Sequence, residues 1–181
     1  SQLVKIASLF FLDERTDGGL GLSTTEVGFI YGTLGVIALL VGVILGGIVI
    51  SKDGLGKWMM PMAFAINAPN IGYVFLAWLQ PDNVYFAGLV VVIEQLGYGF
   101  GFAAFMVFLL FLAEGLFKTA HYALATGFMA MGMMLPGMLS GYVQEWLGYP
   151  GFFVWVVIAT IPGFVMAYLV KFPREFGKKV S

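Results

Sequence analysis

Two ionisable residues lie inside strongly apolar parts of the sequence and are the first candidates for chemistry. Glu94 follows the apolar run Val90–Ile93, and Lys5 lies within the apolar stretch Leu3–Leu12. A charged side chain is costly in an apolar environment, so such residues usually pair with each other or serve a function. Burial favours the neutral acid, whereas a nearby cation favours the carboxylate. A carboxylate held between these effects can take up and release a proton, and we expect Glu94 to do so beside Lys5.

Two alternatives remain for this pair: a fixed ion pair that holds two helices in register, or a Glu94 that lines the wall of a solvated cavity. Three polar residues accompany the pair, namely Gln2, Gln95 and Tyr98. Gln2 precedes Lys5 by three residues and Tyr98 follows Glu94 by four, spacings that place side chains on one face of a helix. We predict that the three residues line a substrate cavity. The alternative is that each one bonds to a neighbouring helix.

Long apolar stretches must position these residues. Five of them fill nearly all of the chain, at residues 26–50, 58–79, 84–112, 119–143 and 149–170. A helix needs about 20 apolar residues to cross the ~30 Å hydrocarbon core of a bilayer. Only helices and closed barrels satisfy their own backbone in lipid, and runs of this length exclude barrel strands. The sequence therefore predicts an all-α polytopic membrane protein.

The composition excludes several classes of protein. Hydrophobic residues make up 60% of the chain, charged residues 10%, and the mean hydropathy is +0.94. The formal net charge of −1 argues against a nucleic-acid partner. The sequence has no cysteine for a disulfide, a thiolate nucleophile or a metal site, and a single histidine has no acidic cluster nearby. We expect no metal, no cofactor and no enzymatic activity, because no Ser/His/Asp set is present.

A sixth apolar stretch, residues 3–12, is shorter than the other five. Ten residues of helix measure about 15 Å, half of a crossing. We expect this stretch to be the end of a helix whose first half lies outside the sequence. The alternative is a short helix that lies in the membrane interface.

Basic residues gather on alternate connections between the apolar stretches. One side of the membrane would carry seven of them: Lys52, Lys57, Lys118, Lys171, Arg174, Lys178 and Lys179. The other side would carry Arg15 alone. Because Lys and Arg in short loops stay in the cytoplasm, the side with seven bases is predicted to be inside. Residues 171–181 then form a cytoplasmic tail.

A second polar group lies near this predicted inner side. His121, the only histidine, follows Lys118 by three residues, and Lys118 follows Glu114 by four. These are helical spacings, and histidine titrates near neutral pH, so a proton relay is conceivable. We predict instead that Glu114, Lys118 and His121 form a cytoplasmic gate; a solvated helix end is the alternative.

Prolines and glycines interrupt the apolar stretches. Pro69, Pro136 and Pro162 fall inside predicted helices, where each removes a backbone hydrogen bond. Asn67 and Asn70 flank Pro69, and we expect them to bond the backbone groups that the proline frees, or else to contact substrate. Four pairs of glycines are spaced by four residues, which allows close helix packing in lipid. These pairs are Gly28/Gly32, Gly42/Gly46, Gly97/Gly101 and Gly137/Gly141.

Three segments carry a family resemblance. Residues 21–35 read GLSTTEVGFIYGTLG, and residues 97–105 (GYGFGFAAF) are followed by HYALATG at 121–127. Residues 141–149 read GYVQEWLGY, with Phe152 and Phe153 close behind. In this order, the segments resemble the entry to helix 8, helices 10 and 11, and the junction of helices 11 and 12 in the AmpG-type muropeptide permeases of the major facilitator superfamily.

The resemblance implies the C-terminal six-helix bundle of a twelve-helix transporter. Residues 1–12 would end helix 7, and the five long stretches would be helices 8 to 12. In this superfamily helices 7, 8, 10 and 11 line the central cavity, which would place Lys5 and Glu94 on cavity helices and Asn67 and Asn70 on a peripheral one. The loop at 47–57 departs from the superfamily pattern Gly-x-x-x-Asp-Arg-x-Gly-Arg-Arg, because its bases are fewer and differently ordered.

The function implied by the resemblance is secondary active transport: import of a cell-wall anhydro-muropeptide by alternating access, coupled to protons, across a bacterial inner membrane. The expected partners are a small polar solute, the proton, membrane lipid and the N-terminal half-bundle of the same protein. One alternative is a symporter for another polar or anionic solute, such as a sugar or acyl-coenzyme A. Another is a non-transporting membrane module that binds a lipid or a further subunit.

Overall fold

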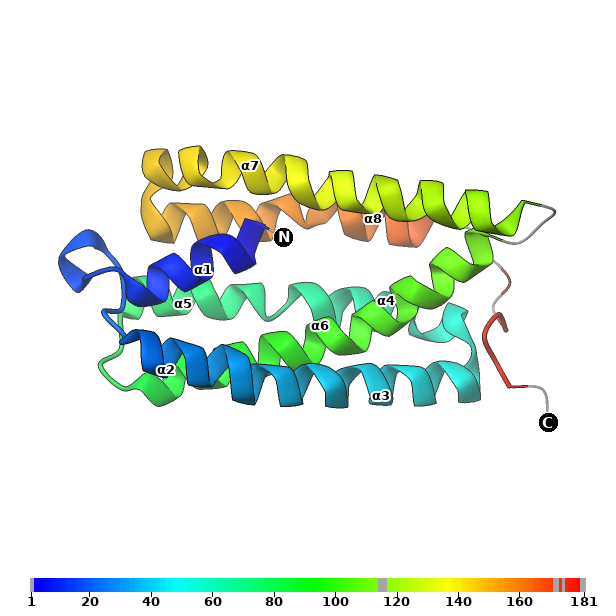
Figure 1. Cartoon of the computed structure of the whole chain (residues 1–181), viewed down its shortest axis with the longest axis horizontal. Helices are drawn as coiled ribbons and strands as arrows, with labels where there is room; N and C mark the ends of the chain where they lie inside the picture. The colour runs from blue at the N-terminus through cyan, green and yellow to red at the C-terminus, as the bar shows by residue number, and fades with distance from the viewer. Residues whose placement is uncertain (1, 114–116, 171–172, 174, 180–181) are drawn as a thin grey trace.

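The computed structural model describes residues 2–113, 117–170, 173 and 175–179, with residues 2–5 described by their backbone alone. Within these residues the regular secondary structure is helical, with no β-strand (Figure 1). Four helical spans among them are long and apolar enough to cross a membrane: Thr24–Asp53, Leu55–Leu79, Val84–Leu112 and Lys118–Leu169. The prediction of an all-α polytopic membrane protein is confirmed.

The first part of the chain forms one short helix and one long, three-part helix. Its elements are α1 (Gln2–Leu12), the 3-10 turn η1 (Arg15–Asp17), α2 (Thr24–Phe29), the π-helical segment η2 (Ile30–Gly35) and α3 (Val36–Asp53). Ser23 caps the long helix: its hydroxyl accepts from the Glu26 N–H at 3.2 Å, and its own N–H donates to the Glu26 carboxylate at 2.8 Å. This reciprocal capping box fixes where the span begins.

The second part of the chain contains a reversal that the helix bounds conceal. Its elements are α4 (Leu55–Asn67), α5 (Asn70–Leu79), α6 (Val84–Leu112), α7 (Lys118–Ala159) and α8 (Ile161–Leu169). Within α7, Gly148 has φ 66° and ψ 174°, a backbone conformation that glycine adopts readily. Figure 1 shows the yellow part of α7 running to this point and the orange part returning beside it toward α8. The long span Lys118–Leu169 thus contains two antiparallel arms.

The three prolines that the sequence places inside apolar stretches lie in different local settings. Pro136 lies inside α7 as expected, but Pro69 separates α4 from α5 and Pro162 lies in the first turn of α8. Without an N–H, proline cannot bond the carbonyl four residues earlier, so a break forms where no neighbouring group replaces that bond. Pro69 and Pro162 thus lie at interruptions within the helical spans Leu55–Leu79 and Lys118–Leu169.

Asn67 does not bond the carbonyl that Pro69 frees. Its side-chain Nδ2 donates to the Ala63 carbonyl at 2.8 Å, whereas proline at 69 leaves the carbonyl of Ala65 without its usual donor. The Ala65 carbonyl instead lies against the backbone of Gly97 on α6, so closely that any side chain at Gly97 would overlap it. The predicted capping by Asn67 is corrected, and α6 covers the freed group in its place.

Helix α6 lies between α3 and α4, and glycines permit its close approach to both. Toward α3, a Cβ at Gly46 would lie 2.6 Å from the Phe100 carbonyl oxygen, and a Cβ at Gly42 or Gly99 would overlap the facing backbone. Toward α4, a Cβ at Gly101 would lie 2.7 Å from the Met62 carbonyl oxygen. In lipid, where hydrophobicity does not drive helices together, such backbone contact supplies the packing.

The other predicted glycine pairs do not all serve this purpose. A Cβ at Gly28, Gly32 or Gly141 would meet nothing within 4 Å among the residues that the structure describes. Gly137 is buried. Spacing alone predicts which glycines could allow close packing. Of the four pairs, only Gly42/Gly46 and Gly97/Gly101 have both glycines against the backbone of a neighbouring helix in the described structure.

Two apolar clusters form the core. The larger lies toward the predicted outer end, the end that holds residues 13–23 and 80–83, and includes Phe10, Phe11, Tyr73, Phe152 and Phe153. The smaller lies toward the predicted inner end and includes Ile50, Leu55, Met62, Ala103 and Ala104. Glu94, which lies between them along α6, is therefore positioned by packing at both ends of the bundle.

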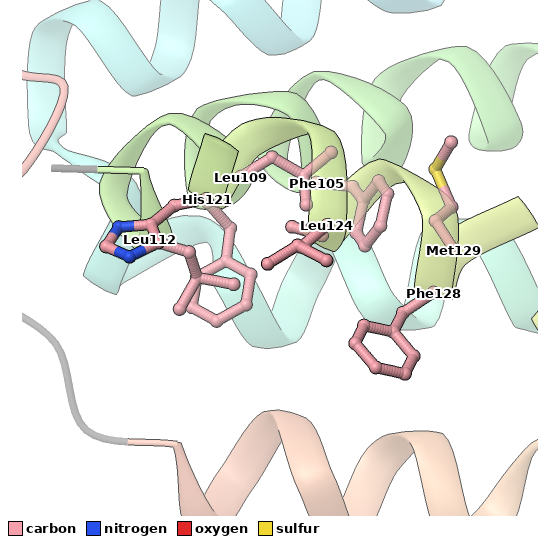
Figure 2. A pocket seen from close by; sticks show the side chains of 9 residues that line it. Phe105, Leu109, Leu112, His121, Leu124, Phe128 and Met129 are labelled. Atoms are coloured by element: carbon pink, nitrogen blue, oxygen red, sulfur yellow. The ribbon is translucent and has the colours of Figure 1, made fainter. Parts of the chain in front are cut away.

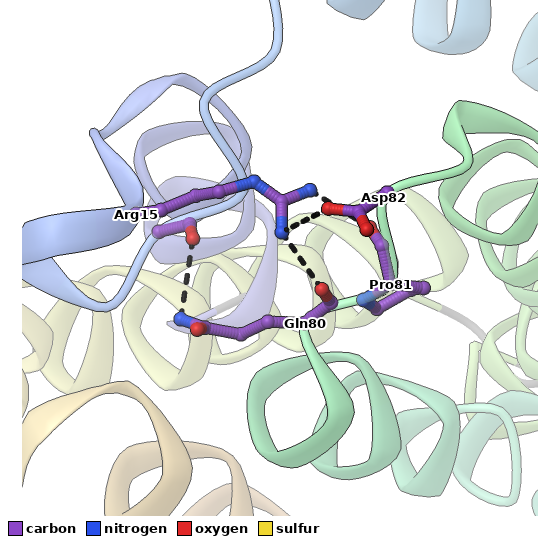
Figure 3. A network of polar contacts seen from close by, with 5 residues as sticks. Arg15, Gln80, Pro81 and Asp82 are labelled. Carbon is purple, nitrogen blue, oxygen red and sulfur yellow. Dashed lines mark hydrogen bonds and ion pairs between the residues drawn. The ribbon is translucent and has the colours of Figure 1, made fainter.

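At the predicted outer end, Arg15 ties the α1–α2 connection to the α5–α6 connection (Figure 3). Its guanidinium donates to the carbonyl oxygens of Gln80 at 2.8 Å and Pro81 at 3.0 Å, and forms an ion pair with Asp82 at 2.9 Å. Gln80 has φ 39°, an unusual value for a residue other than glycine, and its Nε2 donates to the Gly19 carbonyl at 3.3 Å. The two connections thus hold each other.

At the predicted inner end, the tail returns to the α3–α4 connection. The Leu55 N–H donates to the Phe176 carbonyl at 2.8 Å, and the Lys179 N–H donates to the Ser51 carbonyl at 2.8 Å. Asp53 accepts from Lys57 at 2.9 Å and from Trp58 Nε1 at 3.0 Å. The loop that departs from the superfamily pattern is held by these local bonds.

Substituting Gly46 tests the contact between α3 and α6. Gly46→Ala places a methyl group against the Phe100 carbonyl, and we expect a loss of stability of about 1–3 kcal/mol, the usual effect of overpacking. Gly47→Ala is the matched control, because its Cβ would meet nothing within 4 Å. Thermal unfolding of both variants in detergent measures the difference. Equal midpoints for the two variants would contradict the contact.

The outer network allows a comparison of two substitutions. The Asp82 side chain is 99% exposed, and exposed ion pairs contribute little, so Asp82→Ala should leave the unfolding midpoint unchanged. Arg15→Ala also removes two charged bonds to carbonyls and should lower stability by roughly 1–2 kcal/mol. The same unfolding assay compares the two variants. A larger loss for Asp82→Ala would show that the ion pair, rather than the carbonyl contacts, holds the connections.

Candidate functional site

Glu94 is buried beside a polar cavity in the middle of the bundle. Its side chain is 4% exposed, and it borders a cavity of about 380 Å³ between α4, α5, α6, α7 and α8. We call this the Glu94 cavity. Besides Glu94, its polar lining residues are Asn67, Asn70, Tyr98 and Thr160, and Pro136 also borders it. A carboxylate is thus placed next to amide and hydroxyl groups inside an otherwise apolar bundle.

Hydrogen-bonding side chains surround the carboxylate on the bundle side. Gln95 Nε2 donates to Glu94 Oε2 at 2.8 Å. The Tyr31 and Tyr73 hydroxyls lie 3.1 Å apart, and the fully buried Tyr73 lies beside the same carboxylate. Bonds to the ionised form stabilise a buried carboxylate, whereas the apolar surroundings favour the neutral acid. The arrangement can hold a proton at Glu94 and also tolerate its loss.

The π-helical segment η2 supplies part of this environment. Tyr31 is its second residue, and a Cβ at Gly35, its last residue, would lie 3.3 Å from Gln95 Cγ. Single π-helical turns inside α-helices occur frequently at functional sites. Tyr31 and Tyr73 were not predicted as site residues, since tyrosines in apolar helices give no signal that distinguishes a site from the core.

The structure places the predicted site residues unequally. Gln95 and Tyr98 lie next to Glu94, Gln95 through its hydrogen bond and Tyr98 on the cavity wall. Gln2 and Lys5 lie on α1, but their side chains are outside the described part of the chain. The pairing of Lys5 with Glu94 and the contact of Gln2 with substrate therefore stay predictions.

Asn67 and Asn70 reach the same cavity as Glu94. The resemblance to the superfamily implies a peripheral helix for them, and from that position both border the inside of this half-bundle. Thr160 lies opposite, at the break between α7 and α8, and its hydroxyl donates to the Val157 carbonyl at 2.7 Å. Thr160 was not predicted as a site residue, although Pro162 two residues later marks the break.

His121 lies apart from this cavity, near the predicted inner end. It borders an apolar pocket of about 620 Å³ between α6 and α7, together with Phe105, Phe108, Leu112, Leu124 and Phe128 (Figure 2). His121 and Lys118 are exposed, and Glu114 lies outside the described residues. A cytoplasmic gate formed by these three residues stays a prediction.

In the described part of the chain, no three side chains among His, Cys, Asp and Glu gather as metal ligands would. The polar groups of the Glu94 cavity are amides, hydroxyls and one carboxylate, which form hydrogen bonds and exchange protons. The chemistry available at this site is therefore binding and proton transfer.

Comparison with known proteins identifies relatives over most of the chain, although no family model matches it. The chain is 29% identical over 160 residues to the anhydromuropeptide permease of Escherichia coli K12, covering 88% of this chain and 32% of that protein. It is 26% identical over 172 residues to putative transporter AmpG 4 of Rickettsia felis, covering 94% and 40% respectively. It is 22% identical over 152 residues to putative transporter AmpG 1 of Rickettsia prowazekii, covering 84% and 34%.

These relatives confirm the similarity to AmpG-type permeases that the sequence motifs predict. With its apolar helices, the chain is that of an integral membrane protein related to transporters. The chain spans about a third of the length of the curated relatives it matches.

Proposed function

We propose that this AmpG-like chain forms the C-terminal half-bundle of a major facilitator transporter that imports cell-wall anhydro-muropeptides. The observation that carries the proposal is its similarity, over 88% of its length, to a protein named anhydromuropeptide permease. The tail would be cytoplasmic, since the basic residues gather on that side, and the membrane would be a bacterial inner membrane. The absence of a catalytic constellation among the described residues is compatible with a transporter rather than an enzyme.

A second observation supports transport over a non-transporting module. A module that only binds lipid or another subunit needs no polar space at its centre. Here a buried carboxylate, two asparagines and a threonine border a cavity of about 380 Å³. Polar groups at membrane depth are costly and usually mark the path of a solute or an ion. Breaks such as those at Pro69 and Thr160 also occur in the helices that form transporter binding sites.

We further propose that Glu94 couples transport to the proton. A proton shifts an equilibrium between two conformations only if it binds one of them more tightly. At Glu94 the hydrogen bond from Gln95 and the neighbouring tyrosines favour the carboxylate, and withdrawal of that environment would favour the acid. Because α6 contacts α3 and α4 backbone to backbone, the three helices would move together when the two half-bundles rock.

Glu94→Gln tests the coupling role in the protein expressed from its complete gene. The amide keeps the shape of the side chain but cannot exchange a proton, so accumulation of labelled anhydro-muropeptide against a gradient should fall at least about tenfold. Binding should persist, because most contacts remain. Uptake by cells that lack their own permease measures the effect, with the amount of protein in the membrane determined by immunoblot.

Glu145→Gln is the matched control, because Glu145 is exposed near the predicted outer end. It should accumulate the solute as the unmodified protein does. If Glu94→Gln accumulated the solute as well as this control does, with the same dependence on external pH, then Glu94 would not be the coupling residue. If the unmodified protein transported another polar or anionic solute and did not take up anhydro-muropeptide, the substrate assignment would be overturned.

A further inference from the structure

Two helix breaks face each other across the Glu94 cavity. Asn67 and Asn70 flank the break at Pro69 between α4 and α5, and Thr160 lies at the break between α7 and α8. Asn70, Glu94 and Thr160 each lie about ten residues from the predicted outer end of their span, which corresponds to about 15 Å of helix. The polar groups of three different spans therefore meet at one depth, near the middle of the bilayer.

Asn70 is the least explained of these residues. Its side chain is 7% exposed, and in the described part of the chain its amide has no hydrogen-bond partner. Among the residues that the structure describes, no fully enclosed side-chain nitrogen or oxygen is left without a partner, so the Asn70 amide is accessible, and it borders the cavity. A buried amide without a partner is costly, and in native proteins an ordered water or a ligand usually supplies the bond.

The neighbouring groups offer complementary bonds. Thr160 uses its one donor on a backbone carbonyl at 2.7 Å, and Asn67 uses one of its two donors at 2.8 Å. Both side-chain oxygens remain as acceptors, and Asn67 keeps a second donor. Tyr98 has a hydroxyl on the cavity wall, and Glu94 provides the carboxylate. The cavity volume of about 380 Å³ corresponds to about a dozen water molecules at ~30 Å³ each. Space, donors and acceptors for a small water cluster are therefore all present.

We propose that the Glu94 cavity is a water-filled chamber inside the half-bundle that supplies protons to Glu94, and that Asn70 orders its water. This inference rests on the proposed role of Glu94 in coupling. Asn70 is a positioning residue here, since it acts on the water and not on the transported solute. The titratable groups that face Glu94 from the described residues are Tyr31, Tyr73 and Tyr98, which come from η2, α5 and α6.

The residues that line the chamber come from α4, α5, α6, α7 and α8 of this chain. Proton movement along water needs a chain of donors and acceptors and no wide opening. The breaks at Pro69 and Thr160 would provide this, as they turn polar side chains toward one space where continuous helices would present apolar ones. The proton would pass from water to Glu94 without competing with the solute for the same path.

Cysteine reactivity tests whether the chamber holds water. This chain has no native cysteine, and Asn70→Cys places a thiol on the chamber wall. Ile71→Cys is the matched control: it is the next residue at the same depth, and Ile71 is 45% exposed on the outer surface of the bundle, where lipid would surround it. The thiolate, which forms in water and not in lipid, is the nucleophile that attacks a small hydrophilic electrophile.

The protein expressed from its complete gene is labelled in membranes, with the unmodified protein as the background for cysteines elsewhere. We expect Asn70→Cys to react at least about tenfold faster than Ile71→Cys, because only the first thiol can ionise in water. Labelling of Asn70→Cys that is as slow as the control would overturn the proposal, since the chamber would then be dry. This readout needs no transport, so it stands apart from the substrate assignment.

Infrared spectroscopy tests the supply of protons. The band of the protonated carboxyl group that disappears in Glu94→Gln belongs to Glu94, and it shifts when deuterium replaces the proton. In purified full-length protein in vesicles, Asn70→Leu should slow this shift at least about tenfold, because it removes the group that orders the water. Ile71→Leu should leave the rate unchanged, and Asn70→Ser serves if Asn70→Leu does not fold.

Three results would overturn the chamber. One is an unchanged exchange rate in both Asn70 variants. Another is a shift of the Glu94 carboxyl band on addition of sodium at constant pH, with no shift in deuterium. That result would indicate that the cavity binds a cation. The third is equal slowing by Ile71→Leu, which would indicate a general change in packing. Failure of the chamber would leave uptake and its loss in Glu94→Gln unaffected, so the two proposals fail separately.

Discussion

The structure depends on backbone contact between α6 and its two neighbours. A membrane gives helices little hydrophobic reason to associate, so association needs close surfaces. Gly42 and Gly46 admit α6 to α3, and Gly97 and Gly101 admit it to α4. Contact at Gly97 also covers the Ala65 carbonyl, whose usual donor Pro69 removes. The break that opens the Glu94 cavity is therefore tolerated because α6 packs directly over it.

The Glu94 cavity and the close packing both lie where α6 meets α4. Where the backbones of α6 and α4 touch, no space remains for solvent, whereas Asn67 and Asn70 on either side of Pro69 border a space of about 380 Å³. Glu94 precedes Gly97 by three residues, so it lies at the edge between contact and space. A carboxylate at this edge has hydrogen bonds from Gln95 on one side and the cavity on the other.

The sequence predicted the all-helical membrane architecture and the burial of Glu94, because length and hydropathy decide both. It also placed Gln95 and Tyr98 beside Glu94, since helical spacing determines their neighbourhood. It could not predict that Asn70 and Thr160 would join them, because contact between spans distant in sequence depends on how each helix rotates and breaks. The apolar pattern does separate residues 119–143 from residues 149–170, and the structure reverses between them; the positive φ of Gly148 at this turn is the part that no residue pattern reveals.

The central claim is proton-coupled import of a cell-wall fragment, and uptake with and without a proton uncoupler tests it most directly. Cells that lack their own permease would express the protein from its complete gene and receive labelled anhydro-muropeptide. The account predicts accumulation that collapses when the uncoupler dissipates the proton gradient. Accumulation that persists in its presence, or no uptake by protein shown to be in the membrane, would contradict the account.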